Sequence, residues 1–131
     1  MILVIGGAFQ GKLEYVRKTF KGGTGPVAEG ESCTPEEVRQ VSVVNHFHLL
    51  VKRLVEQGED PHEAARKMLE INPDLIIISN ELGCGVVPVT PFDRAYREAA
   101  GRVCCELAAR AAEVHRVVCG LGQVIKAGGN S

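Results

Sequence analysis

Short apolar runs recur along the chain and predict buried β-strands. These runs lie at residues 2–5, 41–44, 75–78 and 114–119. Between them, apolar residues recur at the spacing of one helical face, and this pattern predicts α-helices. The expected helices cover about residues 12–20, 46–57, 61–71 and 91–112. Strands that alternate with helices are typical of an α/β fold with a mainly parallel sheet.

Turn and capping residues mark the ends of these elements. Residues 21–34 are rich in glycine and predict a loop, whereas residues 120–126 predict a turn with a short edge strand. A Thr or Asp directly before a proline predicts the start of a helix, because its side chain can accept a hydrogen bond from the first turn. This signature occurs at Thr34, Asp60 and Thr90.

Length and composition fit one globular domain. The chain has 131 residues, of which 45% are hydrophobic, and a single domain over residues 1–131 is expected. A net charge of −1 gives no reason to expect nucleic acid or an anionic membrane as partner. The apolar start of the chain is too short for a signal peptide, and no apolar run is long enough to span a membrane. We therefore expect a cytoplasmic protein.

The cysteines and two of the histidines carry no predicted chemistry. The five cysteines form no Cys-x-x-Cys pair, and the adjacent Cys104 and Cys105 would point about 100° apart on a helix. We expect reduced, mostly buried thiols and no metal site. His62 and His115 are expected at the surface.

The segment from Gly6 to Lys12 fits the pattern G-x-x-x-x-G-K and lies between a predicted strand and a predicted helix. Backbone N–H groups of such a loop converge on phosphate oxygens, and the lysine reaches the same phosphates. The alternative is a tight turn with a solvated Lys12. Leu13 stands where a Ser or Thr would bind Mg²⁺, so nucleotide binding is better supported than catalysis. The predicted nucleotide-binding residues are Gly6, Gly7, Ala8, Phe9, Gln10, Gly11, Lys12 and Leu13.

A second glycine-containing loop follows the most apolar predicted strand. In open α/β sheets, ligands bind beyond the carboxyl ends of the strands, so this loop is a candidate substrate site. Glu81 could act there as a base or hold a metal-bound water. The chemistry supports equally that Glu81 caps a backbone turn. The candidate substrate loop contains Asn80, Glu81, Gly83, Gly85 and Pro88.

The stretch from Ile78 to Pro88 reads Ile-Ser-Asn-Glu-Leu-Gly-Cys-Gly-Val-Val-Pro. It resembles the signature Ser-Asn-Glu-Val-Gly-x-Gly-Ile-Val-Pro of the adenosylcobinamide kinase / adenosylcobinamide-phosphate guanylyltransferase family. The similarity continues in order through Phe92-Asp-Arg and Tyr96-Arg-Glu to Ile125-Lys. It covers roughly residues 74–126, together with the glycines and lysine of the first loop.

This resemblance implies a P-loop NTPase-like (RecA-like) three-layer fold and a role in cobalamin biosynthesis. It implies a kinase for adenosylcobinamide or a guanylyltransferase that transfers GMP to the resulting phosphate. GTP or ATP would be the nucleotide, and a cobinamide-type corrinoid would be the partner. Lys12 and Glu81 would be the catalytic residues, with Lys12 holding the triphosphate. A homo-oligomer is implied in the same way.

The chain departs from the family pattern where Mg²⁺ would bind. Phe9, Gln10 and Leu13 replace the Arg, Ser and final Ser of the family's phosphate loop. The family's strand-end Asp corresponds to Asn45, and an amide coordinates Mg²⁺ more weakly than a carboxylate. Mg²⁺ therefore stays possible, but Leu13 and Asn45 are unfavourable ligands. The family's guanylylated histidine is also missing, because no histidine precedes Asn45.

His46 and His48 could replace that missing nucleophile. We favour the alternative, in which one of them packs inside the protein and the other is exposed. Two functions stay open: an enzyme of this family, or a catalytically degenerate module that binds nucleotide or corrinoid in a regulatory or scaffolding role. Leu13, Asn45 and the missing histidine favour the module, whereas the nearly intact loop after Ser79 favours the enzyme.

Overall fold

The computed structural model of the chain describes residues 1–82 and 90–128. Within these residues, one sheet has the strand order β2-β3-β4-β1-β5-β6. All neighbouring strands pair in parallel except β5 and β6, which are antiparallel. The strands are β1 (Ile2–Gly6), β2 (Val27–Glu29), β3 (Val43–Asn45), β4 (Ile76–Asn80), β5 (Glu113–Val118) and β6 (Leu121–Lys126).

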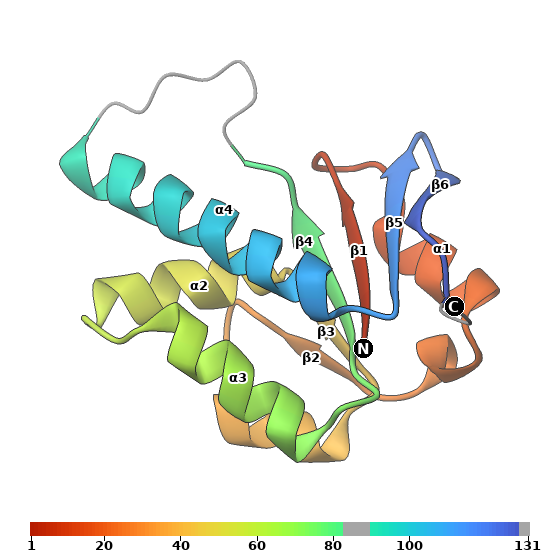
Figure 1. Cartoon of the computed structure of the whole chain (residues 1–131), viewed down its shortest axis with the longest axis horizontal. Helices are drawn as coiled ribbons and strands as arrows, with labels where there is room; N and C mark the ends of the chain where they lie inside the picture. Colours follow the sequence, from red (N-terminus) through yellow and green to blue (C-terminus); the bar gives the residue numbers. More distant parts are fainter. Residues whose placement is uncertain (83–89, 129–131) are drawn as a thin grey trace.

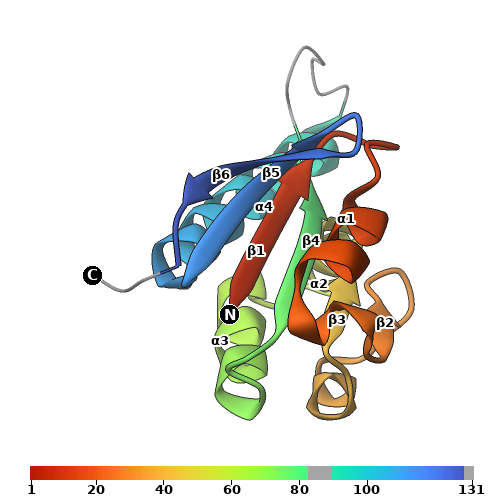
Figure 2. The same cartoon turned by 90° about the vertical axis from the view of Figure 1, so that its right-hand side faces the viewer.

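Helices cover both faces of the sheet, which gives three layers (Figures 1 and 2). One face of the sheet packs against α1, and the other packs against α2, α3 and α4. This confirms the predicted α/β fold with a mainly parallel sheet, of the P-loop NTPase-like type. The helices are α1 (Lys12–Thr19), α2 (Phe47–Glu56), α3 (Pro61–Ile71) and α4 (Pro91–Arg110), with 3₁₀ turns η1 (Lys21–Thr24) and η2 (Pro35–Gln40).

The core follows from the alternation of side chains along the central strands. In β1, Leu3 faces the layer of α2 and α4, whereas Val4 faces Val16 of α1. Both side chains are at most 1% exposed. Burying an aliphatic side chain to this extent stabilises a fold by about 1.5–3 kcal/mol. Two apolar faces therefore hold β1 and β4 rigidly at the centre of the sheet.

Strand β2 lies within the segment that was predicted to be a loop. Only three residues form it, too few for an apolar pattern to stand out among the glycines. It pairs with β3, and Gly30 donates from its backbone N to the Asn45 carbonyl at 2.8 Å. A side chain at Gly30 would lie 2.0 Å from the His46 carbonyl oxygen, so the close approach of these two segments requires glycine.

Two of the three predicted helix caps are confirmed. The Asp60 carboxylate accepts from the backbone N of His62, and the Thr90 hydroxyl accepts from that of Asp93. Thr34 makes no such bond, and the segment after it is the 3₁₀ turn η2. No helix in residues 1–82 and 90–128 is both long enough and apolar enough to cross a membrane.

The prediction that His115 is a surface residue was wrong. Its side chain is buried between α1 and β5, where Nδ1 lies 2.7 Å from the Tyr15 hydroxyl and Nε2 lies 2.9 Å from Glu113. These partners satisfy both ring nitrogens, which is what allows the burial. The expectation of mostly buried thiols also fails for the described cysteines, since Cys105 and Cys119 are exposed.

Candidate functional site

The carboxyl ends of the parallel strands bring the predicted site segments together. Gly6, the last residue of β1, pairs with Asn80, the last residue of β4. The ladder extends one step further, because Glu81 donates from its backbone N to the Gly6 carbonyl at 2.8 Å. The loop of residues 6–12, which we call the phosphate loop after its predicted role, and the Asn80–Glu81 segment therefore leave the sheet side by side, as parallel pairing requires.

The phosphate loop connects β1 directly to α1. Gly11 precedes α1 with a φ of 81°, a left-handed conformation that glycine adopts without strain. The Lys12 side chain is folded into the loop, where its ammonium donates to the Gly7 carbonyl at 2.6 Å. Burial lowers the pKa of Lys12, and the nearby negative charge of Glu81 opposes this shift. The loop thus places the Lys12 side-chain nitrogen at its centre.

An open pocket of about 350 Å³ lies between this loop and the ends of β3 and β4. We call it the Lys12 pocket. Of the predicted nucleotide-binding residues, those from Ala8 to Leu13 line it, together with the Asn45–His46 pair and Asn80, whereas Gly6 and Gly7 do not. Its lining residues are Ala8, Phe9, Gln10, Gly11, Lys12, Leu13, Glu14, Asn45, His46 and Asn80.

Glu29 is a residue of this region that sequence reasoning missed. Its carboxylate accepts from the Asn45 amide at 3.1 Å and lies 2.7 Å from Nδ1 of His46. His46 adopts a left-handed backbone with φ 52°, which is unusual for a non-glycine residue. The only signal in the sequence was that Glu29 follows the two apolar residues Val27 and Ala28. The glycines on both sides of this segment predicted a loop instead of strand β2. Glu29 fixes the orientation of the His46 ring beside the Lys12 pocket.

His48 has a different environment. Its side chain is 6% exposed, and its Nδ1 accepts from the backbone N of Asn80 at 3.1 Å. Burial lowers the pKa of His48 to about 4, helped by the neighbouring His46 and Lys12. The neutral His48 ring therefore connects α2 to the end of β4. Its Nδ1 lone pair is occupied by this hydrogen bond. Of the two histidines, His46 is the one that lines the Lys12 pocket.

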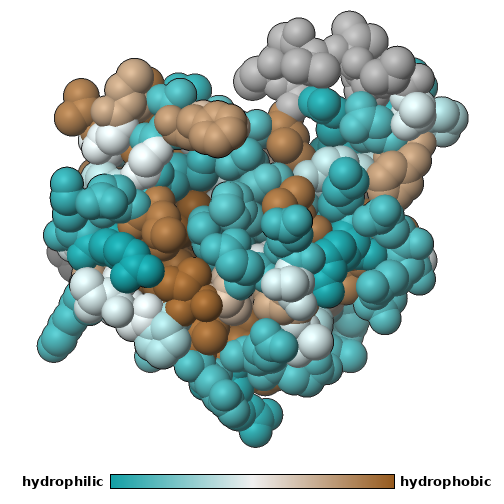
Figure 3. Space-filling model, turned by 180° about the vertical axis from the view of Figure 1, so that it is seen from behind, coloured by the Kyte–Doolittle hydropathy of each residue, from teal (hydrophilic) through white to brown (hydrophobic). Residues whose placement is uncertain are grey.

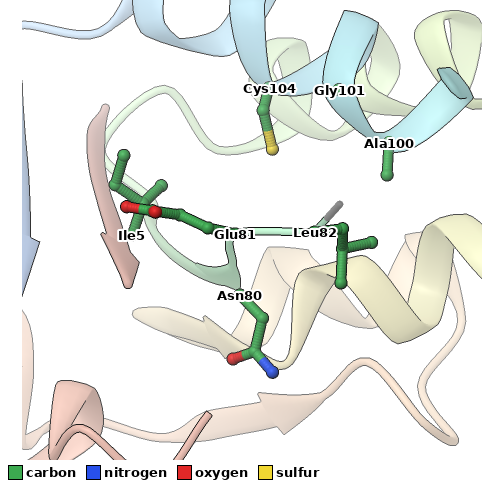
Figure 4. A pocket seen from close by; sticks show the side chains of 7 residues that line it. All are labelled: Ile5, Asn80, Glu81, Leu82, Ala100, Gly101 and Cys104. Carbon is green, nitrogen blue, oxygen red and sulfur yellow. The ribbon is translucent and has the colours of Figure 1, made fainter. Parts of the chain in front are cut away.

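Glu81 lines a second, neighbouring pocket of about 180 Å³, which we call the Glu81 pocket (Figure 4). Asn80 lines both pockets, and Cys104 projects from α4 into the second one. The Glu81 carboxylate accepts from Arg116 of β5 through two bonds, at 2.7 and 3.3 Å. Glu81 therefore lies near Lys12 with a basic partner of its own and is not directed into bulk solvent.

The remaining predicted substrate-loop residues, Gly83, Gly85 and Pro88, lie outside the described residues. Arg116 was another residue that sequence reasoning missed. Its place opposite Glu81 depends on the pairing of β5 with β1, which the sequence pattern around Arg116 does not reveal.

The two positions where Mg²⁺ was expected to bind offer poor ligands for it. Leu13 supplies no donor atom, and Asn45, whose amide nitrogen donates to Glu29, offers only a neutral amide oxygen. Among the described residues, no three His, Cys, Asp or Glu side chains are grouped so that they could hold a metal ion.

Comparison with known proteins identifies relatives of this chain. Two curated proteins are similar over part of their length, both called bifunctional adenosylcobalamin biosynthesis protein CobU, from Escherichia coli (strain K12) and Salmonella typhimurium (strain LT2). Each is 46% identical over 52 residues, which is 40% of this chain and 29% of the relative. The matched segment thus spans less than a third of either relative.

A sequence profile covers more of the chain than these relatives do. The profile described as cobinamide kinase / cobinamide phosphate guanyltransferase matches residues 25–125. Its range includes the strands β2 to β5, both missed residues Glu29 and Arg116, and the stretch from Ile78 to Pro88, but not the loop of residues 6–12. This protein therefore belongs to the cobinamide kinase / cobinamide phosphate guanyltransferase family.

Proposed function

We propose that this protein is a nucleotide-dependent enzyme of cobalamin biosynthesis that acts on a cobinamide-type corrinoid. The observation that carries the proposal is the meeting of the Lys12 pocket and the Glu81 pocket at Asn80. The reactions named in the family description need a nucleotide beside an acceptor group, and the two adjoining pockets would place the phosphates of the one next to the reacting end of the other. We propose a cytoplasmic location and homo-oligomers on the basis of the family resemblance.

Each side chain has a role in this proposal. The backbone N–H groups of the phosphate loop and the Lys12 ammonium hold the triphosphate of GTP or ATP. In the kinase reaction, the acceptor hydroxyl oxygen attacks the γ-phosphorus, and the bond from that phosphorus to the bridging oxygen breaks. Glu81 accepts the hydroxyl proton, and a nucleoside diphosphate leaves. Arg116 holds the Glu81 carboxylate in position and offsets its charge beside the anionic nucleotide.

The proposal is tested by calorimetric titration with GTP and ATP, followed by turnover of adenosylcobinamide. We expect Lys12→Ala to weaken the binding of both nucleotides by at least about tenfold, because a charge-assisted contact is lost. Lys18→Ala is the matched control, since Lys18 lies on the same helix with a side chain that is 74% exposed. Equal affinities of the Lys12→Ala variant and the unchanged protein would remove the loop from the site.

Glu81→Gln separates catalysis from binding. It keeps the shape of the side chain and removes its charge, so turnover is expected to be lost while nucleotide affinity and the melting temperature stay nearly unchanged. If the Glu81→Gln variant still turns over adenosylcobinamide, Glu81 is not the base that accepts the hydroxyl proton.

A second candidate function is a nucleotide- or corrinoid-binding module without catalysis. It is favoured by Leu13 and Asn45, which supply little for Mg²⁺. We expect the affinity for nucleotide to depend only weakly on Mg²⁺, and the double change Leu13→Ser with Asn45→Asp to increase this dependence. Nucleotide binding without any turnover identifies the module. A steep Mg²⁺ requirement in the unchanged protein contradicts the assignment of these two positions.

Covalent chemistry is tested separately by intact mass spectrometry after incubation with GTP. No histidine precedes Asn45, so we expect no GMP adduct. A GMP adduct that maps to His46 would contradict this expectation and would support His46 as a replacement nucleophile, with Glu29 orienting its ring.

A further inference from the structure

Phe9 is an apolar residue in an unfavourable position. It lies in the phosphate loop with its side chain fully exposed, at 103% of the reference area. Its backbone has φ 59°, a left-handed conformation that costs a residue with a side chain about 1–2 kcal/mol. Strained backbone conformations cluster at functional sites, so this exposed ring is a candidate for contact with a ligand.

Gln10 fixes the loop that presents Phe9. The Gln10 side-chain oxygen accepts from the backbone N of Cys119 at 2.6 Å, and its carbonyl accepts from that of Gly120 at 2.8 Å. Both Cys119 and Gly120 have positive φ, of 51° and 78°, as a tight turn between the antiparallel strands β5 and β6 requires. Two hydrogen bonds thus join Gln10, the residue next to Phe9, to the turn of the β5–β6 hairpin.

Phe9 and Lys12 line the same pocket from two positions of one loop. The polar residues Asn45, His46 and Asn80 lie across this pocket. Phosphate groups at Lys12 and the start of α1 would leave the rest of a bound nucleotide to extend along the loop. The large apolar surface that the loop offers for that part is the Phe9 ring.

We propose that Phe9 is the platform on which the planar base of the nucleotide stacks while the phosphates bind at Lys12. This inference rests on the nucleotide-binding function proposed above and assigns the base its place in the site. An aromatic face carries no hydrogen-bonding groups, so it accepts any purine. Phe9 therefore contributes equally to the binding of GTP and ATP.

The test compares three ligands: GTP, ATP and inorganic tripolyphosphate, which lacks a base. We expect Phe9→Ala to weaken GTP and ATP binding by roughly 5- to 150-fold, the range that the loss of one stacked base gives. Tripolyphosphate binding should stay within about twofold, because its contacts lie at the loop backbone and Lys12. Phe9→Tyr keeps the ring and should bind all three ligands like the unchanged protein.

Three outcomes overturn the inference. GTP and ATP binding that Phe9→Ala leaves intact, while Lys12→Ala weakens it, rejects stacking and leaves the nucleotide-binding function standing. An equal loss of tripolyphosphate binding in Phe9→Ala means that Phe9 shapes the loop instead of holding the base. Failure of the unchanged protein to bind any of the three ligands rejects the proposed function and the stacking platform together.

A fluorescence measurement reports the contact directly. The chain has no tryptophan, so Phe9→Trp supplies a single reporter at this position. We expect GTP to quench its emission by stacking and tripolyphosphate to leave it unchanged. Phe92→Trp is the matched control at the start of α4, where Phe92 is also exposed, and GTP should not quench it. Equal quenching of the two variants by GTP contradicts the proposal.

Discussion

At the scale of single residues, His48 shows how the fold changes the chemistry of a side chain. Its Nδ1 accepts a hydrogen bond from Asn80 inside the protein, so only the neutral ring fits. Burial lowers the pKa of His48 from the ordinary 6.5 to about 4. Between these values the unfolded chain binds a proton that the folded protein excludes.

The stability of the protein should therefore fall as the pH drops from 6.5 towards 4. Above pH 6.5 the protonation of His48 takes almost nothing from the free energy of unfolding. By pH 5 it lowers this free energy by about 2 kcal/mol. His48→Asn keeps an acceptor for Asn80 but cannot be protonated, so its stability should fall less over this range. Urea unfolding of both proteins at pH 7.5 and pH 5 measures the difference.

Gln57→Asn serves as the control for this measurement, because Gln57 is exposed at the end of the same helix and neither it nor its replacement takes up a proton. Its pH dependence should match that of the unchanged protein. Parallel pH profiles for His48→Asn and the unchanged protein contradict the role assigned to His48.

At the scale of elements, the short strand β2 positions one side of the site. Glu29 reaches Asn45 and His46 because Gly30 lets the end of β2 approach the end of β3. A methyl group at Gly30 would lie 2.0 Å from the His46 carbonyl oxygen, and a backbone atom cannot move away as a flexible side chain can.

Gly30→Ala should destabilise the protein by about 2 kcal/mol or more and weaken nucleotide binding, because the Glu29–His46 contact beside the Lys12 pocket is displaced. Gly101→Ala is the matched control. A methyl group there meets nothing within 4 Å, and Gly101 lies inside α4, so alanine should stabilise the helix by about 1 kcal/mol. Thermal unfolding of both variants tests the pair, and a Gly30→Ala variant as stable as the unchanged protein rejects the argument.

At the scale of the whole molecule, apolar surface is distributed unevenly. Hydrophobic side chains are visible between hydrophilic ones on the face opposite to that of Figure 1 (Figure 3). Strand β6 is an edge of the sheet, and every one of its residues is exposed. Its large apolar side chains, Leu121, Val124 and Ile125, are 76%, 55% and 56% exposed. An exposed, apolar edge strand is a template for pairing with another chain.

We expect copies of the protein to associate through β6, which would supply the homo-oligomer that the family resemblance implies. Val124→Lys with Ile125→Lys should shift the protein towards a monomer in sedimentation velocity, because charges on an edge strand oppose pairing. Lys67→Glu on α3 is a control that should leave the association unchanged. A monomeric unchanged protein at high concentration contradicts the prediction.

The sequence by itself determined the fold class, because short apolar runs and helical spacing reflect local burial that each segment carries alone. It also located the candidate segments around Lys12 and Glu81, since each is a contiguous motif, and their roles stay predictions. Only the tertiary structure brought Glu29 to His46 and Arg116 to Glu81, because strand pairing joins residues 17 and 35 positions apart. It also decided that His115 is buried and that Phe9 stays exposed. Such environments depend on packing between distant segments, which no local pattern records.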